Sequence, residues 1–152
     1  MVGHPKWQAG LVYVDLFAGP GVCEIETSAR RIPGSPLIAA YASKPFEKII
    51  VCELDPVLAA ACADRLSKVG LPGRAKVIPG DCNENVAQVA GEIPRGALTL
   101  AFIDPTGLHA RFEMVANLSA KGRVDLLVLF ADAYGKVVDW LRSRIRAART
   151  WS

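Results

Sequence analysis

The sequence predicts an α/β fold, a Rossmann-like, doubly wound and mainly parallel sheet with helices on both faces. Three observations support this prediction. Apolar runs of strand length alternate with helical patterns along the 152 residues. The runs are apolar at nearly every position, which is typical of parallel strands buried on both faces. Glycine or acidic residues follow several of the runs directly, at the sheet edge where open α/β folds bind their ligands.

Five strands and five helices are expected in alternation. The strands are expected at residues 11–17, 48–53, 75–78, 97–103 and 124–130. The helices are expected at residues 35–43, 55–69, 83–89, 112–120 and 136–149. Pro36 and Pro56 suit the first turn of their helices, and Gly70 closes the second helix. The last helix is predicted to be amphipathic, because its apolar residues recur at helical spacing.

Length and composition indicate one domain spanning residues 1–152. The chain has the length of a single domain and contains no linker or internal repeat. Its hydrophobic content of 51% and charged content of 22% are those of an ordinary globular protein. There is no uninterrupted apolar run of about 18 residues and no signal-peptide pattern at the N-terminus. We therefore expect a cytoplasmic protein that does not span a membrane.

The cysteines do not predict a metal site or a disulfide framework. They are Cys23, Cys52, Cys62 and Cys82. None forms a CxxC pair and the intervals do not suit zinc, so no bound metal is expected. Cys52 and Cys62 are interpreted as small buried hydrophobic residues. A nucleophilic Cys82 is disfavoured, because no histidine or arginine stands beside it in the sequence.

The first expected strand ends in the segment DLFAGPG, residues 15–21. Gly19 and Gly21 allow a tight turn and let a ligand approach the main chain. A pyrophosphate-binding loop has a third glycine, whereas Glu24 follows here and would repel phosphate. A cationic ligand without phosphate, such as S-adenosylmethionine, therefore fits better than a dinucleotide. The predicted cofactor contacts in this segment are Asp15, Phe17, Gly19, Pro20 and Gly21.

The second expected strand ends in Glu53 and Leu54, which are also predicted to contact the cofactor. A carboxylate at this position can accept hydrogen bonds from both ribose hydroxyls. Asp55 is interpreted as the cap of the following helix. Gly21 and Glu53 lie 32 residues apart (53 minus 21), compared with about 20 in dinucleotide-binding folds. The excess falls in the charged segment 24–36, which is either a substrate lid or a surface excursion.

Asp81 and Cys82 follow the third expected strand and complete the predicted cofactor site. Asp81 is expected near the adenine amino group, and Cys82 is expected to supply a backbone amide and an apolar edge. The alternative is that Asp81 or Asn83 only caps the next helix.

Asp104 and Pro105 follow the fourth expected strand and are the predicted catalytic residues. The carboxylate and the proline carbonyl can accept hydrogen bonds from a target amine and hold it in line with a methyl donor. The gain in rate would come mainly from positioning the two reactants. The alternative for Asp104 is an Asx turn that ends the strand. His109 is either a base or a surface histidine.

The charge pattern says little about partners. The net charge is +3, which does not indicate a partner by itself. Four arginines crowd the last expected helix, and they are Arg142, Arg144, Arg146 and Arg149. They form either a solvated face or a contact with phosphates or another anionic surface.

Six segments together resemble one known family. They are DLFAGPG (15–21), GSP (34–36), CELDP (52–56), GDCN (80–83), FIDPTGL (102–108) and DLLVLF (125–130). In this order they resemble the three-Cys-motif partner proteins, a family similar to class I S-adenosylmethionine-dependent methyltransferases. The resemblance runs from about Val12 to Tyr134. It implies a Rossmann-like fold, S-adenosylmethionine as cofactor, methyl transfer, and a separate partner protein that carries the three-Cys motif.

Two features depart from related methyltransferases. DNA enzymes that methylate base amines have a second proline and an aromatic residue where this chain has Thr106 and Gly107. No Pro-Cys pair of the kind used by cytosine C5 enzymes is present. Class I methyltransferases also usually have more strands than the five visible here. The chain is therefore a shortened version, a fragment, or one share of a larger assembly.

The predicted function is that of an S-adenosylmethionine-dependent methyltransferase whose acceptor is unknown. The FAGPG loop and the C-terminal arginines favour a nucleic-acid substrate. The alternative is a non-catalytic, methyltransferase-like scaffold or binding module that acts with a partner protein. A nicotinamide-dependent oxidoreductase is disfavoured by the missing third glycine and by Glu24.

Overall fold

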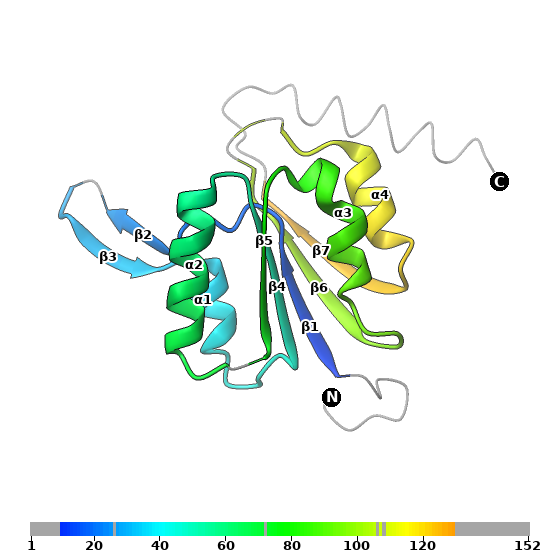
Figure 1. Cartoon of the computed structure of the whole chain (residues 1–152), viewed down its shortest axis with the longest axis horizontal. Coiled ribbons are helices and arrows are strands. Elements are labelled where there is room, and N and C mark those ends of the chain that lie inside the picture. Colours follow the sequence, from blue (N-terminus) through cyan, green and yellow to red (C-terminus); the bar gives the residue numbers. More distant parts are fainter. Residues whose placement is uncertain (1–9, 26, 72, 106, 108, 130–152) are drawn as a thin grey trace.

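A five-stranded, wholly parallel sheet forms the centre of the protein (Figure 1). The computed structural model describes residues 10–25, 27–71, 73–105, 107 and 109–129. The strands of the sheet are β1 (Leu11–Asp15), β4 (Lys48–Glu53), β5 (Ala75–Pro79), β6 (Leu98–Ile103) and β7 (Arg123–Val128). They lie in the order β5-β4-β1-β6-β7. The predicted α/β, Rossmann-like fold is confirmed.

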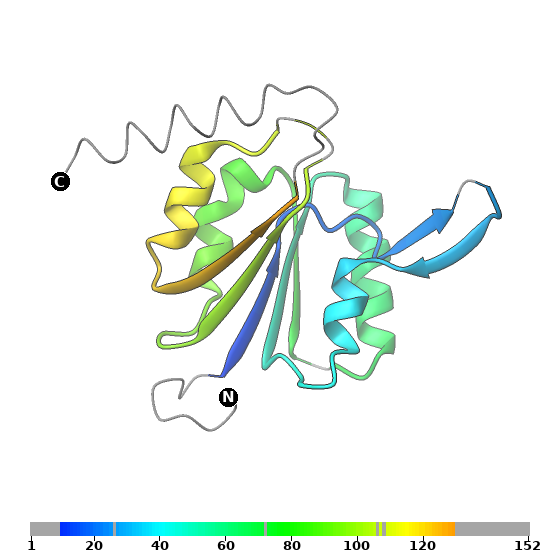
Figure 2. The ribbon, with the colours of Figure 1, turned by 180° about the vertical axis from the view of Figure 1, so that it is seen from behind.

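Helices lie on both faces of the sheet (Figures 1 and 2). The helices are α1 (Ser35–Ala40), α2 (Pro56–Lys68), α3 (Cys82–Gly91) and α4 (Phe112–Ser119). From β1 the chain moves outward through β4 to β5, and right-handed crossovers place α1 and α2 on one face. It then returns past β1 to β6 and β7, so the same handedness places α3 and α4 on the other face. The reversal beside β1 creates a switch point at the carboxyl edge of the sheet.

Each face of the sheet has its own apolar core. On β1, Val12 and Val14 pack toward α3 and α4, whereas Tyr13 packs toward α1 and α2. This follows from the alternation of side chains along a strand. Leu118 of α4 and Leu66 of α2 are almost fully buried in the two cores. The site at the carboxyl edge therefore rests on packed layers above and below the sheet.

Coverage is incomplete at β7. Leu127 and Leu129 are 49% and 45% exposed, and no described helix packs on β7 from the face that carries α1 and α2 (Figure 2). The expectation that every strand is covered on both faces is thus wrong for β7 within the described part of the chain. The helix expected at 136–149 lies outside the described residues, as does Phe130.

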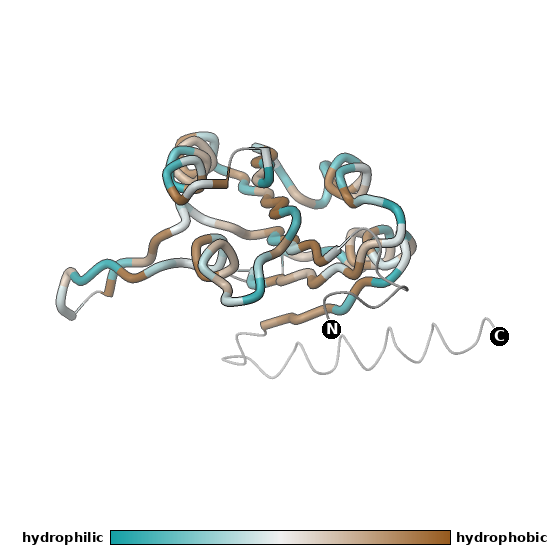
Figure 3. Tube along the Cα trace, turned by 90° about the horizontal axis from the view of Figure 1, so that it is seen from below, coloured by the Kyte–Doolittle hydropathy of each residue, from teal (hydrophilic) through white to brown (hydrophobic). Residues whose placement is uncertain are grey.

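A two-stranded antiparallel ribbon replaces the expected loop 24–36. It consists of β2 (Val22–Ile25) and β3 (Arg30–Pro33), and we call it the arm. The arm extends sideways from the body of the molecule (Figures 1 and 3). Its side chains are almost all exposed, so no buried face produced an alternating apolar pattern in the sequence.

The remaining boundaries differ only slightly from those expected. Strand β1 ends at Asp15 rather than at residue 17, because the chain turns there into the glycine segment. The Asp55 carboxylate accepts hydrogen bonds from the backbone N–H of Val57 (2.7 Å) and Leu58 (3.3 Å), which confirms that it caps α2. Among the described residues, no helix combines the length and apolarity needed to cross a membrane.

Candidate functional site

The glycine loop, residues 16–21, follows β1 at the switch point. Gly19 and Gly21 have φ angles of 58° and 80°, in the left-handed region that favours glycine. A Cβ atom added at Gly19 would have no heavy atom within 4 Å, so this side of the loop faces open space. The Gly19 N–H donates to Glu53 Oε2 at 2.7 Å. The structure thus brings together two residues that the sequence predicted to share a site.

Glu53 lies half-buried at the carboxyl end of β4. Its Oε1 accepts a hydrogen bond from the backbone N–H of Asp55 at 2.9 Å, and its Oε2 accepts the bond from Gly19. Each carboxylate oxygen can accept a further hydrogen bond, so Glu53 can still bind hydroxyl groups. Leu54 beside it is 69% exposed. A charged acceptor and an apolar surface therefore lie next to one another at this strand end.

Asp15 lies beneath the glycine loop and is 0% exposed. Its carboxylate accepts hydrogen bonds from Ser35 Oγ (2.6 Å), Tyr13 Oη (3.1 Å) and the Phe17 N–H (3.2 Å). Burial raises the pKa of Asp15 to about 6, although these hydrogen bonds act in the opposite direction. The Asp15 side chain is thus used to join β1, the loop and the start of α1. The contribution of Ser35 could not be read from the sequence, although it belongs to the GSP segment.

Arg65 and Gly34 hold the outer half of the glycine loop. Arg65 of α2 donates from Nη1 to the Pro20 carbonyl at 2.6 Å. The Gly34 N–H donates to the Gly21 carbonyl at 2.9 Å and closes the base of the arm. No local pattern marks Arg65 in the sequence, because its acceptor is 45 residues away.

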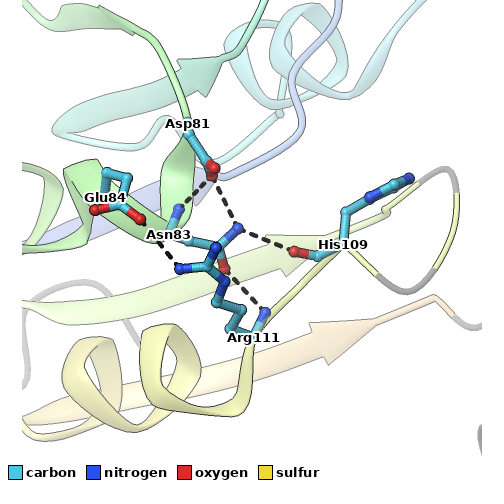
Figure 4. A network of polar contacts seen from close by, with 5 residues as sticks. All are labelled: Asp81, Asn83, Glu84, His109 and Arg111. Atoms are coloured by element: carbon cyan, nitrogen blue, oxygen red, sulfur yellow. Dashed lines mark hydrogen bonds and ion pairs between the residues drawn. The ribbon is translucent and has the colours of Figure 1, made fainter.

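Asp81 caps α3 and takes part in a wider polar network (Figure 4). Asp81 Oδ1 accepts hydrogen bonds from the backbone N–H and the side-chain Nδ2 of Asn83, both at 2.8 Å. Asn83 Nδ2 also donates to the His109 carbonyl at 2.9 Å, and Asn83 Oδ1 accepts from the Arg111 N–H at 2.9 Å. The capping alternative is therefore confirmed for Asp81. A ligand contact through its other oxygen stays a prediction.

The buried thiols are not activated. Cys82 is 4% exposed, and burial raises its pKa to about 12. Burial likewise raises the pKa of Cys52 and of Cys62 to about 11. Such thiols stay protonated at neutral pH, which agrees with the expectation that Cys82 is not a nucleophile. Within the described part of the chain, no cluster of His, Cys, Asp or Glu is placed to hold a metal ion.

Asp104 and Pro105 follow β6, which pairs with β1. Their strand end therefore lies beside the glycine loop, and the Leu16 N–H donates to the Phe102 carbonyl at 3.3 Å. Asp104 is exposed. The alternative of an Asx turn involves the backbone of Thr106, which lies outside the described residues, so both interpretations of Asp104 stay open. The ring of His109 points away from the network in Figure 4.

The carboxyl edge carries mainly negative charge among the described residues. The acidic side chains at the ends of its strands or shortly after them are Glu53, Asp55, Asp81, Glu84 and Asp104. The two arginines nearby are engaged with the protein, Arg65 with Pro20 and Arg111 with Glu84. This edge therefore favours a ligand that is cationic or neutral over a polyphosphate.

Known structures share the fold of this chain. No protein-family model and no curated protein matches it significantly. It is similar to a conserved hypothetical protein of Streptococcus pyogenes, with 18% identity and a TM-score of 0.53 over 78% of this chain and 65% of that one. It is similar to yhhF, a candidate methyltransferase of Escherichia coli, with 19% identity and a TM-score of 0.50 over 77% and 58%. A candidate caffeoyl-CoA O-methyltransferase of Staphylococcus aureus has 11% identity and a TM-score of 0.51 over 79% and 50%.

These similarities agree with the Rossmann-like fold, and two of the three structures carry methyltransferase names. At such low identities, a shared fold does not carry an activity with it. The chain spans between 50% and 65% of the length of these three structures.

Proposed function

We propose that this chain binds S-adenosylmethionine at the carboxyl edge of its sheet and uses it for methyl transfer. The observation that carries the proposal is the hydrogen bond of 2.7 Å between the Gly19 N–H and Glu53 Oε2. It joins an open glycine loop to a carboxylate at the end of the neighbouring strand, at the switch point of an open α/β sheet. The methyltransferase names of two structural neighbours support the proposal.

The residues present fit this cofactor. Glu53 retains hydrogen-bond acceptors for two ribose hydroxyls, and the exposed Leu54 offers an apolar surface for an adenine ring. The backbone of Gly19 faces open space in which a ligand can approach without meeting a side chain. The negative charge of the edge suits a sulfonium and an amino group better than it suits a pyrophosphate.

S-adenosylmethionine would supply a methyl group already activated for transfer by its sulfonium. The protein then needs mainly to bind and orient the two reactants. Asp15, Ser35 and Arg65 hold the shape of the glycine loop from below and from the side. Asp104 and the Pro105 carbonyl would accept hydrogen bonds from a target amine. We assign Asp15 to support rather than to ligand contact, because its side chain is fully buried.

The resemblance to three-Cys-motif partner proteins supports a more specific proposal. The chain would act together with a protein that carries the three-Cys motif, and the methyl acceptor would be a nucleic acid. The acidic carboxyl edge does not favour phosphate at the site itself. A nucleic-acid acceptor therefore requires cationic contacts elsewhere, and the C-terminal arginines are the candidates in the sequence.

The first experiment measures S-adenosylmethionine binding by calorimetry to the wild type, Glu53→Ala and Glu47→Ala. Glu53→Ala should weaken binding at least about tenfold, because hydrogen bonds to a charged acceptor contribute about 1.5–3 kcal/mol each. Glu47 is a matched control, since it is an exposed glutamate that immediately precedes the opposite end of the same strand. Glu47→Ala should bind as the wild type does.

The result separates the two candidate functions. Binding that depends on Glu53, followed by transfer of a labelled methyl group to nucleic acid or protein, supports the enzyme. Binding without transfer to any acceptor, with or without a partner, favours the scaffold that the alternative describes. A folded wild type that does not bind S-adenosylmethionine would contradict the proposed site.

A further inference from the structure

One amide side chain links the two halves of the proposed site. Asn83 stands at the start of α3 and donates from Nδ2 to Asp81 Oδ1 and to the His109 carbonyl (Figure 4). Its Oδ1 accepts the backbone N–H of Arg111 at 2.9 Å. Asp81 belongs to the predicted cofactor side. His109 and Arg111 belong to the segment between β6 and α4, and we call its described residues 104, 105, 107 and 109–111 the acceptor loop.

The strands that precede these two segments are not neighbours in the sheet. The acceptor loop follows β6 and the start of α3 follows β5, and β4 and β1 lie between these strands. No ladder of hydrogen bonds therefore connects the two segments directly. Packing of α3 against α4 brings them near one another, and polar contacts of Asn83 and of Arg111 connect them.

Two polar links connect the acceptor loop to α3, and the one through Asn83 is better suited to hold the loop in place. The other link is the ion pair between Arg111 Nη1 and Glu84 Oε1 at 3.1 Å, whose side chains are 63% and 70% exposed. Such exposed pairs contribute little to stability. Asn83 is half-buried and satisfies one backbone carbonyl and one backbone N–H of the acceptor loop. Asn83 is also not needed as the helix cap, because Asp81 fills that role.

We propose that Asn83 is a positioning residue that holds the acceptor loop in register with the cofactor side of the site. It fixes the backbone at His109 and Arg111, on the chain that leads from Asp104 and Pro105 to α4, relative to Asp81. The catalytic meaning of this link rests on the proposed function. The link itself is a property of the protein without ligand and can be measured there.

The test measures amide hydrogen exchange in the ligand-free wild type, Asn83→Ala and Asn85→Ala. Asn85 is a matched control, because it lies on the same helix and donates to the Pro79 carbonyl at 3.1 Å, away from the acceptor loop. Asn83→Ala should speed exchange at Arg111 and at its neighbours in the acceptor loop by about tenfold or more, since the bond that protects the Arg111 N–H is lost. Exchange in β1 and β6 should stay unchanged, and Asn85→Ala should leave the acceptor loop as in the wild type.

Two outcomes would overturn the proposal. One is acceptor-loop exchange in Asn83→Ala within about twofold of the wild type. The other is faster exchange throughout the sheet as well, which would show a general structural role. If Asn83→Ala does not fold, Asn83→Leu replaces it. This variant has nearly the same size but lacks both the Oδ1 acceptor for the Arg111 N–H and the donor to the His109 carbonyl, and the same local increase is expected.

A ligand measurement keeps this inference separate from the proposed function. Asn83→Ala should bind S-adenosylhomocysteine within about threefold of the wild type, because Asn83 acts on the acceptor side, whereas Glu53→Ala should lose binding. Loss of binding in Asn83→Ala, with Asn85→Ala unaffected, would contradict the assignment to the acceptor side. Absence of binding in the wild type would count against the proposed function, while the exchange data would still decide the role of Asn83.

Discussion

Asp15 combines full burial with three hydrogen bonds to its carboxylate. Burial disfavours the charged form, whereas the hydrogen bonds favour it. The balance leaves the pKa at about 6, above the ordinary value of 3.8. Near neutral pH the carboxylate is mostly ionised, so the loop is held by charge-assisted hydrogen bonds. The charge is retained at a cost in stability.

The raised pKa of Asp15 predicts how the free energy of unfolding depends on pH. A carboxyl group whose pKa is higher in the folded state stabilises the fold at low pH, and this contribution is lost as the pH rises toward 6. The difference between 3.8 and about 6 corresponds to a decline of up to about 3 kcal/mol. Asp15→Asn should remove most of this decline, as measured by urea unfolding between pH 4 and pH 7.5. Asp125→Asn, an exposed control on β7, should keep the wild-type profile. An unchanged slope in Asp15→Asn would show that Asp15 is not the group responsible.

The candidate site residues that could be located from the sequence are those defined by their place at the end of a strand or directly after it. Gly19, Glu53 and Asp104 could be found in this way, because parallel strands bring their carboxyl ends to one edge. Arg65 and Asn83 could not be assigned their contacts from sequence. Their partners lie 45 and 26 to 28 residues away, and only the packing of the helices brings them together.

At the scale of elements, the arm was the main feature that the sequence did not predict. Its strands pair only with one another, and their side chains are mostly exposed. An isolated two-stranded ribbon is marginally stable in water, so its base needs support. That support is the close approach of Gly34 to Gly21, where a Cβ atom on Gly34 would lie 3.1 Å from the Gly21 carbonyl carbon.

The close approach predicts opposite effects for two glycine substitutions. Gly34→Ala should lower the free energy of unfolding by about 1–2 kcal/mol, because backbone atoms on both sides must shift. Gly91→Ala should raise it by up to about 1 kcal/mol, since Gly91 is helical and a Cβ atom there meets nothing within 4 Å. Urea unfolding of both variants checks the pair. A Gly34→Ala variant as stable as the wild type would show that the base of the arm is not tightly packed.

At the scale of the whole molecule, the right-handed crossovers and the return of the chain past β1 explain why helices lie on both faces of the sheet. The alternation of strands and helices could be predicted, whereas the order β5-β4-β1-β6-β7 requires the return of the chain past β1. The apolar run in β7 predicted burial on both faces. Within the described residues β7 is covered on one face only, because burial depends on what else packs there and not on the strand alone.

This difference in coverage predicts a contrast between two leucines. Leu118 is 0% exposed in the core beneath α4, and Leu118→Ala should lower the free energy of unfolding by about 2–5 kcal/mol. Leu127 on β7 is 49% exposed, and Leu127→Ala should change it by less than about 1 kcal/mol. Both values come from denaturant unfolding of the full chain. A large loss in Leu127→Ala would show that another part of the protein covers this face.

The hydrogen bond between Gly34 and Gly21 has a further consequence for the evolution of the protein. It brings the two ends of the arm together, so residues 22–33 form a protrusion whose first and last residues lie next to one another. Insertions, deletions and substitutions within such a protrusion leave the positions of β1 and α1 unchanged. Proteins with this sheet can therefore diverge freely in the arm while the loop beneath it is preserved.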